Sequence, residues 1–549
     1  MILSWLGTEG WCRKGRAYGE QGQHERAIEC YDQALKLNID AVAAWYYKGL
    51  ALNTIQRYRE AAECFDRGIR IDPDCTRLWL ARCQALFRLQ RYREAAEYCG
   101  HAIKLVPGCV DAWLIKGHAF RKMERTADAL ACYDRVVAIE PDCVEAWASK
   151  GMVFATERRY AAAIDCYDRI IVLDPENADA WYARGTIQAL LARNGDAITS
   201  YDHALAIDPG HADAWSARGC TLLALKRYRE AVGCFDRALA IRPGDPESLY
   251  GRGLAFQSLE CYEEAIESYD LALRANPDRT EIWYRRATAL EKLKRYDLAL
   301  ISLDRALKKA TIDPEIWHRK GLILFNLKRY DLAIECFDQA LRLQADLPDA
   351  HCYRGESYYA LGNYRAAAED YLIAVRMAPK NAVTWNNYGN ALCRLERYEE
   401  ALVCYERALE VDPENYRVWS NKANVLSVLS HYDKALVCYD RELRAHPENA
   451  DAWCKKGLAL FVLGRYSEAV ACYTRALEAD PAKAEIWSMK GNALMVLDRP
   501  GEAFDCYDHA LATNPDDVEA LRGIAMALVS LGRAAEAVRY YERLQRLRR

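Results

Sequence analysis

Apolar and polar positions follow the three-and-four spacing of amphipathic helices along nearly the whole chain, and the pattern recurs every 34 residues. Segment 110–143 illustrates it. The apolar face of its first half contains Trp113, Gly117 and Phe120, the pattern breaks around 124–126, and a second face contains Ala129, Tyr133, Val136, Val137 and Ile139. Pro141 follows, and proline cannot continue a helix. The segment therefore predicts two helices joined by a short turn.

Tryptophan marks the same position in most of these segments. The set comprises Trp11, Trp45, Trp79, Trp113, Trp147, Trp181, Trp215, Trp283, Trp317, Trp385, Trp419, Trp453 and Trp487. Counted from Thr8, the period gives sixteen units without insertion or deletion. Each helical hairpin leaves one apolar face uncovered and must bury it against its neighbours. The sequence therefore predicts an all-α stack of hairpins with no single central core.

The residues Trp113, Gly117, Phe120, Ala129, Tyr133 and Pro141, with their equivalents in nearly every unit, resemble the tetratricopeptide-repeat pattern. The chain is similar to long prokaryotic arrays of this family and to the repeat arm of O-linked N-acetylglucosamine transferases. The resemblance implies an α-solenoid, a right-handed superhelix of about two turns for sixteen units. We expect a short lead at 1–7, a first superhelical turn at 8–279 and a second at 280–549.

Several units depart from the pattern. Leu249, His351 and Leu521 replace the tryptophan, and the closing proline is replaced by Ile39, Thr311 and Ala345. In the last two cases Pro314 and Pro348 appear three residues later. Losing a buried tryptophan costs about 3–5 kcal/mol unless the space is refilled. Segment 308–353 is thus either a harmless variation or a flexible joint between the two superhelical turns.

Composition sets limits on partners and compartment. The chain has 52% hydrophobic and 28% charged residues and a net charge of −4, so no global positive field favours nucleic acid or anionic membrane as a partner. No apolar stretch is long enough to span a membrane, and a cytoplasmic location is expected. Ten of the 21 cysteines share one repeat position: Cys30, Cys64, Cys132, Cys166, Cys234, Cys336, Cys404, Cys438, Cys472 and Cys506. We interpret them as packing residues in a reducing compartment.

A search for catalytic chemistry finds no phosphate-binding glycine loop, no nucleophile elbow and no zinc motif. Repeated carboxylates such as Asp179 and Glu247 fall at the starts of the predicted first helices, where the positive end of the helix dipole stabilises a negative charge. Repeated arginines such as Arg57 and Arg227 share an inter-helix turn and are interpreted as a solvated row. We expect no enzyme activity, no cofactor and no metal.

In the resembled family the first helix of each repeat lines a concave groove. In units 144–258 the corresponding positions carry no charge; they include Ser149, Met152, Leu190, Cys220, Tyr250 and Gly251. This strip indicates either contact with apolar side chains of a ligand or small residues that allow neighbouring helices to pack closely.

A second groove zone is polar and is the predicted peptide-binding site. Its residues are Arg285, Arg319, Asn386, Asn387, Asn390, Arg394, Arg417, Asn421, Asn424 and Lys455. Asparagine offers a donor and an acceptor to a peptide backbone, and the cations can hold a carboxylate. The zone resembles both the carboxylate clamp of cochaperone repeat domains and the asparagine ladder of the transferase arm. Asn386 and Asp451 stand where the clamp has basic groups, so we expect backbone recognition; solvated polar variation is the alternative.

The predicted function is a non-enzymatic scaffold that holds a protein or peptide segment in its groove. Two alternatives are a substrate-recognition arm of a separate or missing enzyme domain, such as a glycosyltransferase, and a self-assembling rod. No capping helix follows the last unit, which ends at Arg549. We therefore also expect self-association through uncapped ends.

Overall fold

The computed structural model describes residues 7–547, and every regular element in that range is a helix. The predicted all-α stack of sixteen hairpins is confirmed by thirty-two consecutive helices between Thr8 and Leu547, within the described residues. Contacts divide the chain into two compact units, Met1–Pro277 and Asp278–Arg549. The apolar lead expected at the N-terminus, with Ile2, Leu3, Trp5 and Leu6, lies outside the described residues.

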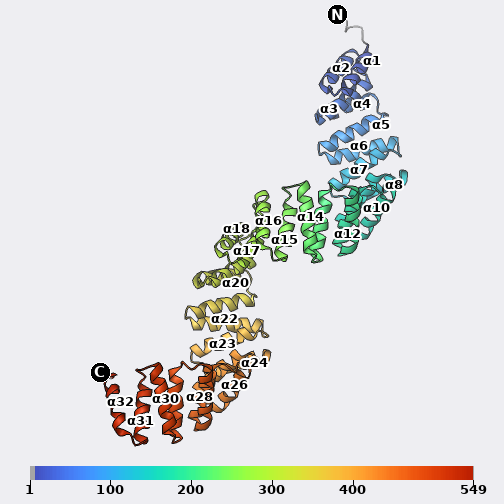
Figure 1. The fold of residues 1–549 in the computed structure, drawn as a ribbon. Coiled ribbons are helices and arrows are strands. Elements are labelled where there is room, and N and C mark those ends of the chain that lie inside the picture. Colours follow the sequence, from blue (N-terminus) through green and yellow to red (C-terminus); the bar gives the residue numbers. More distant parts are fainter. Residues whose placement is uncertain (1–6, 548–549) are drawn as a thin grey trace. The chain divides into compact units, whose positions relative to one another are not determined.

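In the first unit, successive helices stack side by side (Figure 1). The bounds are α1 (Thr8–Glu20), α2 (His24–Leu37), α3 (Val42–Thr54), α4 (Tyr58–Ile71), α5 (Thr76–Arg88), α6 (Tyr92–Leu105), α7 (Val110–Lys122), α8 (Thr126–Ile139), α9 (Val144–Thr156), α10 (Tyr160–Leu173), α11 (Ala178–Leu190), α12 (Asn194–Ile207), α13 (Ala212–Ala224), α14 (Tyr228–Ile241), α15 (Pro246–Ser258) and α16 (Tyr262–Ala275).

The second unit repeats this arrangement. Its helices are α17 (Thr280–Lys292), α18 (Tyr296–Leu307), α19 (Pro314–Asn326), α20 (Tyr330–Leu343), α21 (Pro348–Ala360), α22 (Tyr364–Met377), α23 (Ala382–Arg394), α24 (Tyr398–Val411), α25 (Tyr416–Val428), α26 (Tyr432–Ala445), α27 (Ala450–Val462), α28 (Tyr466–Ala479), α29 (Ala484–Val496), α30 (Pro500–Thr513), α31 (Val518–Ser530) and α32 (Ala534–Leu547).

In twelve of the sixteen hairpins in the described residues, the core is a close contact between a glycine of the first helix and an aromatic ring of the second. A Cβ added at Gly389 would lie 2.6 Å from Cε1 of Tyr405, and one at Gly219 would lie 2.8 Å from Cε1 of Phe235. The rings at this position are among the largest fully buried side chains of the described residues. The absence of a Cβ therefore sets how closely the two helices approach.

The tryptophans play a different part from the one expected. With the exception of Trp45, those in the described residues are only partly buried. The indole Nε1–H of Trp147 donates to the carbonyl of Pro141 at 2.9 Å, which closes the turn before its helix. Where the proline is missing, the same carbonyl still accepts: Trp45 donates to Ile39 at 2.7 Å and Trp317 to Thr311 at 3.0 Å. The tryptophan thus fastens the inter-repeat turn more than it fills the core.

The turn inside each hairpin requires one residue in the left-handed region. Glycine supplies it at Gly22, Gly362, Gly464 and Gly532, whereas the other repeats use non-glycine residues such as Glu124, with φ of 58°. The following amide closes the turn, as when the N–H of residue 125 donates to the Phe120 carbonyl at 2.9 Å. This reversal is the break in periodicity seen at 124–126.

Ion pairs tie neighbouring repeats together. A lysine or arginine of a first helix reaches the acid of the preceding second helix, as in Lys150–Asp134 at 2.6 Å and Lys456–Asp440 at 2.6 Å. The arginines of the hairpin turns pair locally instead; Arg227 lies 2.7 Å from Glu230, and both are about half exposed. Most of the repeated charges are thus engaged within the array.

First helices of successive hairpins also contact one another, for example α5 with α7, α13 with α15 and α29 with α31. We call the surface formed by the first helices of a unit its inner face. The ten cysteines at the shared repeat position are all buried, as predicted. In the third hairpin the glycine–aromatic pair itself is replaced by two buried cysteines, Cys83 and Cys99.

At 308–353 the structure shows how the pattern is altered. Helix α18 has 12 residues instead of the 14 of most second helices, and Pro314 and Pro348 begin α19 and α21. His351 does not leave a cavity where tryptophan is missing: its Nδ1 lies 2.8 Å from Oδ1 of Asp370, and both side chains are almost fully buried. Arg354 donates to Asp370 at 2.6 and 2.8 Å and to Asp338 at 2.5 Å. A buried ionic cluster replaces the indole.

The glycine contact predicts opposite effects for two substitutions in one hairpin. In α13–α14, Gly219→Ala should destabilise the hairpin by about 1–3 kcal/mol, because the new methyl group collides with the Phe235 ring. Gly233→Ala, which meets nothing within 4 Å, should stabilise it by about 0.5–1 kcal/mol. Amide hydrogen exchange of the hairpin measures both; equal signs for the two variants would contradict the contact's role.

The ionic cluster predicts acid-sensitive local stability. Burial alone would raise the pKa of Asp370, but hydrogen bonds from Arg354 and His351 lower it below its ordinary value. Since the folded pKa lies below the unfolded value of about 3.9, the stabilisation is complete above about pH 4 and is lost as pH falls through the folded pKa.

We expect Asp370→Asn to destabilise α21–α22 by about 3 kcal/mol near neutral pH, because it leaves a buried arginine with one partner. Asp338→Asn is the matched control: it removes the more exposed carboxylate and should cost about 1 kcal/mol or less. Hydrogen exchange at several pH values measures both. A loss for Asp370→Asn that is the same at pH 3 and pH 7 would contradict the assignment.

Candidate functional site

The predicted asparagines form a connected polar row on the inner face of the second unit. Asn421 on α25 donates to Oδ1 of Asn386 on α23 at 2.9 Å, and Asn386 lies 3.5 Å from Asn387. Asn387 in turn donates to Oε1 of Glu356 on α21 at 3.0 Å. All four side chains are partly buried. The structure therefore brings side chains of three successive repeats into one row, which we call the amide row (Glu356, Asn386, Asn387 and Asn421).

Asn390 and Asn424 lie one turn further along α23 and α25, and each contacts the hydroxyl of a buried tyrosine. The hydroxyl of the core residue Tyr405 donates to Oδ1 of Asn390 at 2.8 Å, and that of Tyr439 lies 3.5 Å from Oδ1 of Asn424. With the carbonyl oxygen occupied, each side-chain amide keeps its two N–H donors for a ligand. The hydrogen bond from the core fixes the side chain before any ligand arrives.

The predicted cations at this end are exposed. Arg394 donates to the hydroxyl of Tyr364 at 2.8 Å, and its guanidinium carbon lies 4.8 Å from that ring's centroid. Arg417 stacks in the same way on Tyr416 at 5.8 Å. Lys455 makes no hydrogen bond or ion pair with residues 7–547. Arginine on an aromatic face keeps its fork oriented toward solvent, so these groups stand ready for an acidic partner.

Asp451, which departs from the clamp pattern, forms an ion pair with Lys483 of the next repeat. This pair lowers the pKa of Asp451, chiefly through the hydrogen bond from Lys483. The carboxylate is therefore occupied within the array.

Arg285 and Arg319 lie away from the amide row, on α17 and α19. They line a cavity of about 340 Å³ between α17 and α19, together with Tyr284 and Glu315. Arg319 lies 3.3 Å from Glu291 and donates to the Tyr284 hydroxyl at 3.3 Å. The Nε of Arg285 is buried and lacks a hydrogen-bond partner among the described residues. The predicted site is thus divided into two parts that share no lining residue.

A second cavity, of about 230 Å³, opens beside the amide row. Its lining residues come from α19 to α23 and are Phe325, Tyr330, Glu356, Tyr359, Ala360, Tyr371, Asn387 and Asn390. We call it the aromatic pocket. Sequence reasoning identified its two asparagines but missed the aromatic side chains and Glu356. One signal was present: among the sixteen residues at this repeat position, Glu356 is the single acid.

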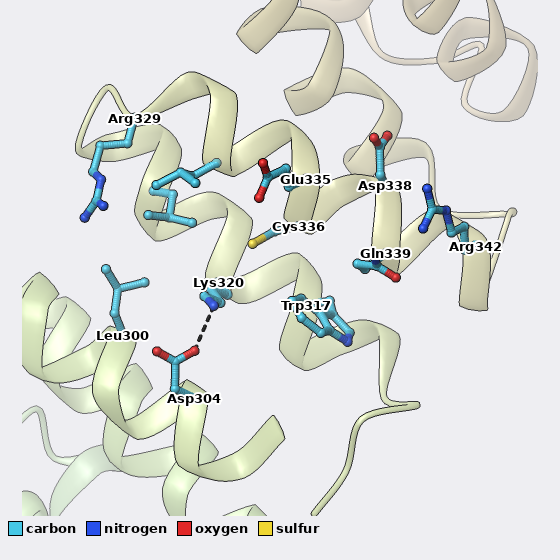
Figure 2. Close-up of a pocket in the computed structure, with 12 residues that line it drawn as sticks. Leu300, Asp304, Trp317, Lys320, Arg329, Glu335, Cys336, Asp338, Gln339 and Arg342 are labelled. Carbon is cyan, nitrogen blue, oxygen red and sulfur yellow. Dashed lines mark ion pairs between the residues drawn. The ribbon is translucent and has the colours of Figure 1, made fainter. Parts of the chain in front are cut away.

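Another cleft in this half of the chain is shown in Figure 2. It has about 500 Å³ and lies between α18, α19 and α20. Lys320 and Asp304, both at its edge, pair with each other at 2.7 Å (Figure 2). Its other charged groups include Arg329, Glu335 and Arg342. Charges of both signs surround an apolar floor, so the cleft favours no particular class of ligand.

The charge-free strip expected in the first unit is only partly a surface. Met152 and Leu190 are 42% and 62% exposed, but Ser149, Tyr250 and Gly251 are buried. A Cβ at Gly251 would lie 2.4 Å from the Phe235 ring of the preceding repeat. Those buried positions therefore serve close packing between repeats and were wrongly placed in the groove.

Within the described residues, no group of three or more histidine, cysteine or carboxylate side chains is arranged to hold a metal ion. In the same part of the chain, no helix combines the length and apolarity that crossing a membrane requires.

Comparison with protein families gives one consistent result. A family model described as "Tetratricopeptide repeat" matches residues 12–74, 54–109, 114–178, 156–212, 420–484 and 488–549. Other models of the same description match 200–233, 220–282, 280–308, 348–381 and 382–415, and one described as "TPR repeat" matches 321–362. No curated protein gave a significant match.

Several solved structures show distant similarity. The Cut9–Hcn1 hetero-tetramer structure of APC/C is 14% identical with a TM-score of 0.36, covering 95% of this chain and 96% of that one. YrrB, titled a TPR protein with an unusual peptide-binding site, is 23% identical with a TM-score of 0.31, covering 36% and 99%. MamA from Desulfovibrio magneticus RS-1 is 24% identical with a TM-score of 0.30, covering 31% and 95%.

Proposed function

Because the chain belongs to the tetratricopeptide-repeat family, whose repeats generally form non-catalytic interaction scaffolds, we propose that its second unit binds an extended segment of a partner protein. The binding surface is the inner face of α21–α27, where the amide row, Asn390 and Asn424 lie. The observation that carries the proposal is the hydrogen-bonded row of three asparagine amides and the Glu356 carboxylate, which together span three successive repeats.

Amide side chains suit a peptide backbone, because each peptide unit offers one donor and one acceptor whatever its side chain. Asn390 and Asn424 present N–H donors, since tyrosine hydroxyls already occupy their carbonyl oxygens. They lie on successive first helices at the same register, so an extended segment crossing the repeats meets one donor in each. A segment in this conformation has unpaired backbone carbonyls to accept them.

The cations extend the surface toward acidic groups. Arg394, Arg417 and Lys455 are exposed on α23, α25 and α27, and a carboxylate of the bound segment would gain charge-assisted hydrogen bonds from them. Arg285 and Arg319 would meet a second part of a long segment, because their cavity lies on first helices of the same unit. We therefore expect the bound segment to carry acidic residues near the Arg417 end.

The proposal predicts that Asn387, Asn390, Asn421 and Asn424 act together. Peptides selected on the full chain from a displayed library of random dodecapeptides should bind the variant with all four changed to alanine at least about tenfold more weakly, because several ligand hydrogen bonds are lost. Fluorescence anisotropy measures the affinity, and circular dichroism should show unchanged helicity.

Asn492→Ala is the matched control. Asn492 stands at the same repeat position as Asn390 and Asn424 and likewise accepts from a core hydroxyl, that of Tyr507, at 2.7 Å, but it lies on α29, beyond the proposed binding surface of α21–α27. It should leave peptide affinity unchanged. Equal affinity of the fourfold variant and the unmodified chain would refute the proposed site.

A further inference from the structure

We propose that the aromatic pocket binds the cationic side chain of a lysine or arginine in the captured segment. This inference rests on the proposed function and specifies the kind of segment it selects. Its basis is the partly buried carboxylate of Glu356, which has no ion-pair partner among residues 7–547 and lies in a small cavity walled by aromatic rings.

The size of the cavity suits one side chain. Its volume of about 230 Å³ lies below the range of about 300–1,000 Å³ found for small-molecule pockets. Phe325, Tyr330, Tyr359 and Tyr371 contribute four rings from α19 to α22. Aromatic faces attract cations through their quadrupole and also cover the methylene stem of a long basic side chain.

Glu356 supplies the negative charge. Its Oε1 accepts from Asn387 at 3.0 Å and from the thiol of Cys352 at 3.8 Å, whereas Oε2 accepts no hydrogen bond from residues 7–547. No lysine, arginine or histidine of the described chain forms an ion pair with it. Burial raises its pKa, since a charge in this setting has lost water without gaining a counter-ion. An entering ammonium or guanidinium would supply that counter-ion.

The neighbouring cations of the chain have other partners and do not neutralise Glu356. Arg394, on the helix that supplies Asn387 and Asn390, is directed to the hydroxyl and ring of Tyr364 and does not line the cavity. Arg354, on the same helix as Glu356, is engaged by Asp338 and Asp370. The equivalents of Glu356 in the two neighbouring repeats, Leu322 and Asn390, are neutral. The cation-binding feature is thus confined to one repeat.

A direct test uses single residues as probes on the full chain. Saturation-transfer difference NMR titrations with Nα-acetyl-lysine methylamide and the arginine analogue should show binding. The norleucine analogue, which keeps the stem but lacks the charge, should bind about tenfold more weakly or not at all. Similar signals for lysine and norleucine, or no binding of either cation, would overturn the proposal.

Two variants locate the binding. Glu356→Gln keeps the shape and the acceptor for Asn387 but removes the charge, and should weaken lysine binding about tenfold. Tyr359→Leu removes one ring and should weaken it several-fold. Glu399→Gln, which removes an exposed charge from α24, is the control and should have no effect. Unchanged lysine binding by Glu356→Gln would place the cation elsewhere.

The outcome can be separated from that of the proposed function. Peptides selected on the full chain should share one lysine or arginine, and this preference should vanish when the selection uses Glu356→Gln. Peptides that depend on the asparagines yet show no basic preference would reject the pocket assignment alone. Lysine binding without any asparagine-dependent peptide would reject the extended-segment function and keep the pocket.

Discussion

The contact between a bare glycine backbone and an aromatic ring determines the spacing of the two helices in twelve of the sixteen hairpins that the structure describes. At Gly389 and Gly219 no side chain larger than hydrogen fits between the two helices. Because the spacing is set within each hairpin, adjoining hairpins have similar packing surfaces. They can therefore stack in the same way at every 34-residue repeat. The constant interval in the sequence is a consequence of this constant geometry.

Uniform packing leaves the inner face free to vary. The side chains that point there belong to first helices, yet they do not set the distance between the helices. One repeat position therefore carries Met152, Thr186 and Cys220 in the first unit and Glu356, Asn390 and Asn424 in the second. Function in such an array resides in what these positions hold, and the fold hardly restricts the choice.

The sequence was sufficient to predict the helices, their pairing and their number, since periodicity and turn residues are local signals. It also located the asparagines on one surface, because residues 34 apart occupy equivalent positions. The partners of individual side chains were not predictable in this way. Trp147 looked like a core residue from its apolar surface, but the structure shows its indole bonded to a turn carbonyl.

The same limit explains why the aromatic pocket was missed. Tyr371 is predictable as a core residue and Tyr359 as an ordinary turn-side aromatic, and nothing local reveals that both rings border one cavity with Glu356. That cavity involves three hairpins, and its shape depends on how their first helices lie against one another. Which side chains of different repeats lie side by side depends on how the repeats pack, and the pattern of a single repeat does not contain this information.

The position of the pocket also gives a reason for the unusual cluster around His351. Helix α21 lacks the tryptophan that fastens other first helices to their turns, and it is the helix that carries Glu356 and Tyr359. Arg354 holds it instead, bridging Asp338 of α20 and Asp370 of α22. Charged hydrogen bonds in a buried setting are directional and tolerate little displacement. A binding carboxylate must be held in place before its ligand arrives, and this bridge restrains α21 from the helices on both sides.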